Sequence, residues 1–283
     1  MAEFILSAFA DEYSSRFPVQ LDALRSFGIG YIEPRFIDGK NVADLDTPEA
    51  EAVKKQLDDA GIRVSAIGSP LGKINLADDF DAHLEKARRV METARILDTE
   101  RIRVFSFYLR EGLSRDDCRG EVLEKFGAMA DLADSFGVTL CHENEAKIYG
   151  ESPERCLDLM KTFGGKVRCV FDMGNFVLDG YRPYPDAYGL LADYISYFHI
   201  KDALSAGAIV PAGCGEASVR EILHAHRKKY GDVLLSAEPH LQTFDGLNRL
   251  VGKGFVNPYQ FESKEAAFAE AVKCIKELLS EEV

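Results

Sequence analysis

Eight short apolar segments, spread along the 283 residues, constrain the fold of this chain more than any other feature. They are rich in β-branched and aromatic residues, and they begin 24 to 40 residues apart, which leaves room each time for a loop and a helix. The segments are FILSAF (4–9), GIGYIEP (28–34), IRVSAIG (62–68), IRVFSFY (102–108), VTLCHE (138–143), VRCVFD (167–172), ISYFHI (195–200) and VLLSAE (233–238). A strand followed by a helix, eight times over, predicts a (β/α)8 TIM barrel formed by residues 1–283 as a single domain.

The intervals between the segments carry helical patterns with recognisable ends. Thr47 and Ser152 each stand before a proline, which predicts a side-chain acceptor at the N-cap and a proline at the first helical position. Gly61 and Gly137 stand where a helix must stop before the next strand. A doubly wound open sheet is the alternative, but neither G-x-G-x-x-G nor G-x-x-x-x-G-K-[ST] follows the first segment, so its nucleotide-binding version lacks support.

Charge and cysteine usage limit the partners and the compartment. A formal net charge of −13 repels nucleic-acid phosphates, so we expect a small-molecule partner and no nucleic acid. The first apolar run is too short to span a bilayer and acids follow it at once, so we expect no membrane association. The six cysteines are scattered without paired spacing, which favours a reducing cytoplasmic location. A homo-oligomer remains open.

The last four segments each end on a side chain that can bind a metal. They end on Glu143, Asp172, His199 and Glu238, and in a barrel the carboxyl ends of the strands share one rim. Two like charges about 4 Å apart repel by about 4 kcal/mol at an effective dielectric of 20, so three clustered carboxylates need a cation or protons among them. Taken singly, each acid also fits as a helix cap or an ion-pair partner. Together, the four predict a site for one divalent ion, with Mn²⁺ expected first and Mg²⁺, Co²⁺ or Zn²⁺ as alternatives.

Several motifs resemble one family. LCHENE, VFDMGN, YFHIKDA and LLSAEPH, together with YIEPRFIDGKNVADL and VSAIGSPLGKI, resemble the sugar phosphate isomerases and epimerases of the xylose isomerase-like TIM barrels. In that family a Glu, an Asp, a His and a Glu at the ends of the fifth to eighth strands bind one divalent metal, and the resemblance carries these roles onto the four residues named above. Members include ketose 3-epimerases, hydroxypyruvate isomerase, inosose dehydratase and, more distantly, metal-dependent apurinic endonucleases. The resemblance therefore implies the fold and the metal site more firmly than the substrate.

The chemistry shared by these members needs two acid–base groups. A metal that chelates a carbonyl oxygen and a neighbouring hydroxyl lowers the pKa of the C–H between them and stabilises the enediolate. Glu143 and Glu238 are the expected catalytic pair, as ligands whose second oxygen stays free to move a proton. We therefore expect a metal-dependent sugar or sugar phosphate isomerase or epimerase. An inosose dehydratase-type lyase, an apurinic endonuclease and a non-catalytic sugar-binding barrel are the alternatives.

Other residues near the strand ends are candidate substrate contacts: Glu33, Arg35, Ser69, Lys73, Tyr108, Asn175, Lys201 and His240. Glu33 and Arg35 resemble a pocket-lining stretch of the family, but a surface ion pair would explain them equally. Lys201 would either orient a substrate oxygen or hold Asp202. Asn175 departs from the family pattern, in which many members have a histidine three residues after the aspartate. An amide binds a sugar hydroxyl but is not a strong zinc ligand, which disfavours a second metal and the endonuclease.

Three further features of the sequence concern the surroundings of the predicted site. His142 precedes Glu143 by one position, so its side chain should point to the opposite face of the strand and pack against a helix. The glycine-rich segments 210–223 and 240–261 would cover the substrate or contact another subunit. Backbone amides near Gly213 and Gly215 would bind a phosphate or form a tight turn, and the turn is favoured.

Overall fold

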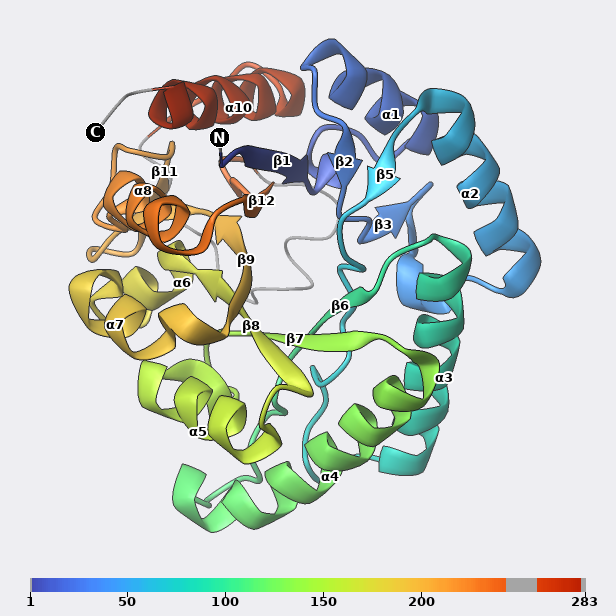
Figure 1. Ribbon diagram of the computed structural model, residues 1–283, viewed down its shortest axis with the longest axis vertical. Helices are drawn as coiled ribbons and strands as arrows, with labels where there is room; N and C mark the ends of the chain where they lie inside the picture. The colour runs from blue at the N-terminus through green and yellow to red at the C-terminus, as the bar shows by residue number, and fades with distance from the viewer. Residues whose placement is uncertain (1, 243–258, 281–283) are drawn as a thin grey trace.

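The parallel strands close into a barrel that helices surround (Figure 1) in the computed structural model, which describes residues 2–242 and 259–280. Six strands form one parallel ladder, in the order β1 (Phe4–Ala8), β12 (Val233–Ala237), β9 (Ile195–Ile200), β8 (Val167–Asp172), β7 (Thr139–Glu143) and β6 (Arg101–Val104). The other two barrel strands, β2 (Tyr31–Ile32) and β5 (Arg63–Val64), pair with each other. Main-chain hydrogen bonds close both gaps, from the Glu33 N–H to the Ala8 carbonyl and from the Ile67 N–H to the Arg101 carbonyl. The predicted (β/α)8 barrel is confirmed, and the closure excludes the open sheet.

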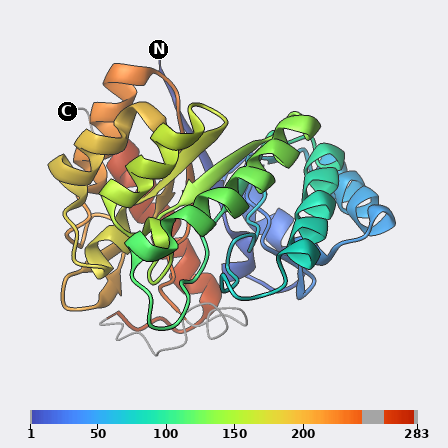
Figure 2. The same cartoon turned by 90° about the horizontal axis from the view of Figure 1, so that it is seen from below.

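Helices follow the strands around the outside of the barrel. The α-helices are α1 (Phe17–Ser26), α2 (Thr47–Ala60), α3 (Phe80–Ile96), α4 (Arg115–Phe136), α5 (Pro153–Phe163), α6 (Met173–Leu178), α7 (Tyr188–Leu191), α8 (Val219–Tyr230) and α10 (Lys264–Ser280). Short helical turns cover Ala10–Glu12, Val42–Asp44, Tyr149–Glu151, Pro183–Ala187 and Ala192–Tyr194. Seen from below, α4 lies between α3 and α5 on the outer surface (Figure 2). Among the described residues, no helix combines the length and the apolar character that a bilayer span requires.

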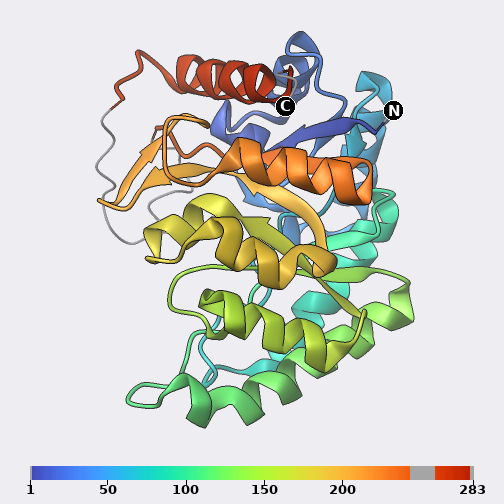
Figure 3. The same cartoon turned by 60° about the vertical axis from the view of Figure 1, so that its left-hand side comes forward.

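Two small hairpins were not predicted from the sequence. Strands β3 (Phe36–Ile37) and β4 (Lys40–Asn41) pair antiparallel after β2, and β10 (Asp202–Leu204) pairs antiparallel with β11 (Ala208–Val210) after β9. Figure 3 shows the β10–β11 hairpin extending beyond the carboxyl ends of the barrel strands. It takes in only Val210 of the segment 210–223 that was predicted as a loop, and α8 takes in residues 219–223. Most of the predicted cover 240–261 lies outside the described residues.

Three of the four predicted helix ends, at Gly61, Gly137 and Ser152, are right, and the fourth is wrong by one residue. Asp46, not Thr47, caps α2, because the Asp46 carboxylate accepts the Glu49 N–H at 2.9 Å while the Glu49 carboxylate accepts the Asp46 N–H at 2.8 Å. Gly61 ends the same helix in the left-handed region at φ 68°, as predicted. Ser152 caps α5, as predicted.

Side chains alternate between the barrel interior and the helix layer, and this alternation places the site. Cys141, Val170 and Tyr197 form a small apolar cluster, and each lies two residues before one of the predicted metal ligands. Residues two apart share a face of a strand, so the ligand candidates lie on the inward face at the carboxyl end of the barrel.

His142 confirms the alternation from the outer face. It is fully buried, its ring meets Phe126 of α4 edge-on at 6.1 Å between ring centroids, and its Nε2 lies 2.9 Å from the Ser106 hydroxyl. Burial lowers the pKa of this imidazole to about 3. The predicted packing of His142 between barrel and helix is confirmed. All six cysteines are free thiols.

Candidate metal centre

Four side chains from consecutive strands meet at the carboxyl end of the barrel. One ligand atom from each of Glu143, Asp172, His199 and Glu238 lies within 4.8 Å of all the others. The four side chains are 0–3% exposed. The structure therefore brings together the quartet named from the sequence, as a buried set that could hold one metal ion.

His199 presents a nitrogen to this quartet that forms no hydrogen bond in the described part of the chain. Its Nδ1 lies 3.1 Å from Oε1 of Glu143 and 3.4 Å from Oε2 of Glu238, without the geometry of a hydrogen bond. Burial lowers the pKa of His199, but the carboxylates of Glu143 and Glu33 outweigh it and hold that pKa well above the usual value. A ring nitrogen that faces three acids, in a site that attracts positive charge, fits a divalent cation.

The two glutamates have matching arrangements on either side of His199. The Oε2 of Glu143 accepts a hydrogen bond from Arg103 Nη1 at 2.8 Å, and the Oε1 of Glu238 accepts one from Arg35 Nη1 at 2.9 Å. The expectation that each glutamate keeps a free second oxygen is therefore wrong, because an arginine occupies it. Burial raises the pKa of Glu143, but His199 and Arg103 together bring it below the usual range. Each paired oxygen still has a second lone-pair site.

Asp172 serves as a helix cap and as a quartet member at once. Its Oδ1 accepts the main-chain N–H of Asn175 at 2.8 Å at the start of α6, and its Oδ2 accepts Lys201 Nζ at 2.9 Å. Burial raises the pKa of Asp172 to about 7, although Lys201 opposes the shift. The amide of Asn175 donates to the Asn144 carbonyl at 2.9 Å and accepts from Lys201 at 3.1 Å. Asn175 and Lys201 thus fix the Asp172 carboxylate through hydrogen bonds.

Asp202 does not pair with Lys201, so that alternative for the lysine is wrong. Its carboxylate accepts main-chain N–H groups from Ala203, Gly213, Gly215 and Ala217 at 2.8–3.0 Å. These amides are directed at a carboxylate of the chain itself, so the turn is confirmed and the phosphate alternative is not supported.

Arg35 is buried in the site rather than paired at the surface. Its side chain is 2% exposed and donates to Asp11 at 2.9 Å as well as to Glu238, with Glu12 at 3.4 Å. Its guanidinium lies 4.6 Å from the centroid of the Phe9 ring. Arg35 therefore forms ion pairs with three carboxylates.

Glu33 is fully buried directly behind His199. Its carboxylate accepts from the Tyr197 hydroxyl at 2.8 Å and the Ser236 hydroxyl at 2.6 Å, and both oxygens lie 3.2 Å from His199 Nε2. The surface-pair alternative is wrong for Glu33 as well.

Lys73 lies at the edge of the site. Its side chain is 12% exposed, its Nζ donates to Glu145 at 2.8 Å, and the same Nζ lies 4.2 Å from the centroid of the Phe105 ring. Arg103 stacks on that ring at 4.7 Å. Lys73 is thus a candidate substrate contact that keeps partial access to solvent.

The remaining three candidates differ in position. His240 faces the site, with Nε2 at 3.3 Å from Oε1 of Glu12 and at 3.5 Å from Oε1 of Glu238. Ser69 instead directs its hydroxyl at the main chain of β6, at 2.5 Å. Tyr108 is half-buried, and its main chain pairs with Asn75 and Ile148.

Several residues that the site uses were not assigned from the sequence, among them Arg103 and Asn144. Arg103 is a charged residue inside the apolar segment IRVFSFY, and that anomaly was the available indication of an inward-facing function. Asn144 exchanges two hydrogen bonds with the main chain of Asp172, at 2.9 and 3.0 Å, which ties β7 to β8 beside the ligands. An asparagine after a strand is common in turns, so no local pattern distinguishes it.

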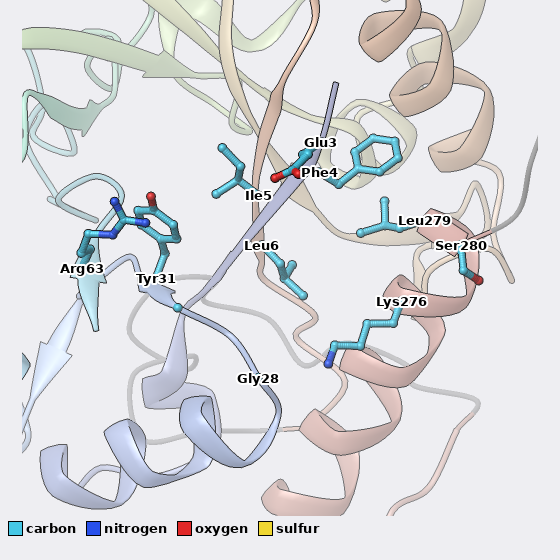
Figure 4. Close-up of a pocket in the computed structure, with 11 residues that line it drawn as sticks. Glu3, Phe4, Ile5, Leu6, Gly28, Tyr31, Arg63, Lys276, Leu279 and Ser280 are labelled. Carbon is cyan, nitrogen blue, oxygen red and sulfur yellow. The ribbon is translucent and has the colours of Figure 1, made fainter. Parts of the chain in front are cut away.

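A separate groove of about 610 Å³ opens at the other end of the barrel (Figure 4). Side chains from the amino ends of β1, β2 and β5 line it together with α10, and Arg63 stacks on the Tyr31 ring at 4.3 Å. The amino end of a TIM barrel does not carry the chemistry, so this groove does not compete with the quartet as the active site.

Known proteins share this architecture. The family described as xylose isomerase-like TIM barrel matches residues 21–278, and no curated protein sequence matches the chain. The IolI protein with a bound zinc atom superposes with a TM-score of 0.75 at 17% identity, over 99% of this chain and 98% of that one. D-allulose 3-epimerase from Methylomonas sp., in complex with D-allulose, gives 0.74 at 14% identity over 98% of each chain. The probable 3-DHS dehydratase AsbF from Bacillus anthracis gives 0.72 at 17% identity, over 98% and 99%.

Proposed function

We propose that this chain, which belongs to the xylose isomerase-like TIM barrel family, is a divalent-metal-dependent isomerase or epimerase of a sugar or sugar phosphate. The observation that carries the proposal is the buried quartet with His199 Nδ1 directed at its carboxylates. Glu143, Asp172, His199 and Glu238 would hold one ion, with Mn²⁺ as the first expectation. The sugar-bound epimerase among the similar structures is consistent with this class of substrate.

Six acids and three bases meet in and around the quartet, and this imbalance supports a bound cation. The acids are Asp11, Glu12, Glu33, Glu143, Asp172 and Glu238, and the bases are Arg35, Arg103 and Lys201. With all nine ionised, the formal sum is three negative charges, and the raised pKa values of His199, Asp172 and Glu12 mean that protons offset part of this sum where no metal is bound. Burying unbalanced charge is costly, so a divalent ion would stabilise the folded protein.

Glu143 and Glu238 are the proposed acid–base pair. A bound divalent cation supplies stabilisation of the negative charge that develops when a proton leaves a carbon next to a carbonyl. Glu143 projects from β7 and Glu238 follows β12, with β8 and β9 between them in the sheet, so these two carboxylates would hold an ion from the two ends of the quartet. One glutamate would remove a proton and the other would return it to the opposite face or to the neighbouring atom.

The surrounding side chains orient these carboxylates. Arg103 and Arg35 hold the outer oxygens, which leaves the inner oxygens directed at the quartet. Lys73 and His240 are the proposed substrate contacts at the edge of the site, because they lie beside the quartet without belonging to it. The free cysteines and the net charge of −13 support a reducing cytoplasmic location and a small-molecule partner.

Two measurements test the proposal. Metal analysis of protein purified without added ions should find one equivalent of Mn²⁺ or a similar divalent ion. In D₂O, the loaded enzyme should then introduce solvent deuterium next to the carbonyl of one member of a panel of ketoses, inososes and hydroxypyruvate. The mass of the product separates isomerisation from the loss of water that a dehydratase would cause.

The contrary outcomes are distinct. Two or three zinc ions per chain would support a nuclease of the same fold and overturn the proposal. No metal, with sugar binding retained, would indicate a non-catalytic barrel. One metal without deuterium exchange in any member of the panel would also overturn the proposed chemistry.

A further inference from the structure

Glu33 is surrounded by hydrogen-bond donors on the side of His199 that faces away from the quartet. Tyr197 and His199 are two residues apart on β9, so both point into the barrel, and Ser236 of β12 is paired with His199 in the strand register. All three approach one carboxylate, at distances of 2.6–3.2 Å, and Glu33 itself is 0% exposed. Both of its oxygens are therefore occupied by the protein and neither reaches a substrate.

The chemistry of these groups fixes how His199 is protonated. An ionised carboxylate only accepts hydrogen bonds, so each of its three partners must donate. His199 therefore carries hydrogen on Nε2, the nitrogen 3.2 Å from both Glu33 oxygens, which leaves Nδ1 as the nitrogen that a cation would bind in place of a proton. That nitrogen faces the carboxylates of Glu143 and Glu238.

The two hydroxyl groups make this arrangement rigid. Tyr197 holds Oε1 of Glu33 and Ser236 holds Oε2, so the plane of the carboxylate cannot turn without breaking one of these bonds. A carboxylate with fixed oxygens also fixes the imidazole that donates to it. The penalty for burying this charge is offset by three donors.

We propose that Glu33 is a positioning residue for metal binding and not a substrate contact, because its carboxylate, held by Tyr197 and Ser236, keeps the Nδ1 atom of His199 directed at the quartet. The inference rests on the proposed function, since it concerns the same single ion. Partners that orient a metal-binding histidine typically change metal affinity by roughly 10- to 100-fold when removed.

The test is an isothermal calorimetric titration of the metal-free protein with Mn²⁺. Glu33→Gln keeps the size of the side chain but removes the acceptor that Nε2–H requires, so we expect Mn²⁺ affinity to fall roughly 10- to 100-fold. Glu145→Gln is the matched control, because Glu145 pairs with Lys73 at the edge of the site and does not contact His199 in the described residues. Its Mn²⁺ affinity should stay at the wild-type value.

A spectroscopic readout separates positioning from general loss of structure. With Zn²⁺ as a diamagnetic probe, the ¹⁵N spectrum of His199 should show hydrogen on Nε2 in the wild type, assigned by comparison with His199→Asn among the six histidines. The Nε2 shift should move in Glu33→Gln while circular dichroism stays unchanged. If Glu33→Gln does not fold, the double variant Tyr197→Phe/Ser236→Ala replaces it as the test. This variant keeps the Glu33 carboxylate but removes the two hydroxyl groups that hold it, so Mn²⁺ binding should weaken several-fold.

The failures of the two proposals are distinguishable. A wild-type protein that binds no divalent ion overturns the proposed function and the present inference with it. A wild type that binds Mn²⁺, with Glu33→Gln within about two-fold of it, overturns the role of Glu33 alone. In the decisive double variant, unchanged affinity would do the same.

Discussion

The two glutamates of the site have surroundings that differ in charge and in the distance along the chain to their partners. Glu143 is held by Arg103, 40 residues away on the adjacent strand β6. Glu238 is held by Arg35, 203 residues away, and the same guanidinium also holds Asp11 and Glu12. The side of Glu143 is thus built within a run of consecutive strands, whereas the side of Glu238 exists only once the barrel has closed.

This difference concentrates acids on the side where the ends of the barrel meet. Burial raises the pKa of Glu12 to about 8, with Arg35 opposing the shift and Glu238 adding to it. On the other side, the Asn175 amide and Arg103 are the neighbours of Glu143 beyond the quartet. On the Glu238 side Arg35 therefore pairs with three carboxylates, with Lys201 as a second partner of Glu238 at 3.2 Å, whereas Arg103 pairs with Glu143 alone.

The largest effects are expected on kcat, when either of the two glutamates is replaced. Glu143→Gln and Glu238→Gln remove the acid–base group but keep the shape, so each should lower kcat by roughly 10²- to 10⁴-fold in the deuterium-exchange assay. The fold should be retained, as checked by circular dichroism. A variant that keeps a rate near that of the wild type refutes the catalytic role of that residue.

Stability should separate the two sides. Removing one partner of a buried ion pair costs about 3–5 kcal/mol, and Arg35→Met leaves three acids without their shared cation. Arg103→Met should cost less, because Glu143 keeps His199 and Asn175 as neighbours. Urea unfolding of the metal-free variants measures both free energies. Equal losses would contradict the contrast drawn between the two sides.

A smaller effect is expected at Asp202, next to Lys201 on the Glu238 side. Asp202→Ala leaves main-chain N–H groups in the loop that ends at Ala217 without their acceptor, at a cost of about 1–3 kcal/mol for buried donors. Hydrogen exchange at Gly213 and Gly215 should speed up, whereas Asp202→Asn should retain part of the protection. Unchanged exchange in Asp202→Ala would show that the turn holds without the carboxylate.

The smallest effect is a pH dependence at the loop that carries Lys73, on the Glu143 side. The Nε2 of His83 accepts the Gly72 N–H at 2.9 Å, and burial lowers the pKa of His83 to about 4, with Lys86 adding to the shift and Asp78 opposing it. The folded pKa lies below the unfolded value near 6.5, so this contribution is complete above that pH and is lost as the pH falls towards 4.

The measurement compares unfolding free energies at pH 7 and pH 5. The wild type should lose about 1–2 kcal/mol more than His83→Gln, because glutamine can accept the Gly72 N–H without titrating. The difference between the two proteins removes the contribution of every other titrating group. An identical loss in both would assign the acid sensitivity elsewhere.

Local pattern was sufficient for the strands and for the quartet. Strand length, strand spacing and alternation are properties of neighbouring residues, so the eight segments, the outward side chain of His142 and the four ligand candidates were all predictable. The N-cap of α2 was missed by one residue because Asp46 and Thr47 are both good caps, and only the reciprocal bond with Glu49 selects between them.

The sequence by itself determined the barrel and which strand ends carry acids and an imidazole, because both follow from the order of apolar and polar residues along the chain. Only the tertiary structure decided which polar groups pair: Arg35 with the acids after β1 and β12, Lys201 with Asp172 rather than Asp202, and Glu33 with the back of His199. Such pairs join residues up to 203 positions apart. They arise because closure of the barrel buries charged groups that must then find partners, and no local pattern specifies which partner each will find.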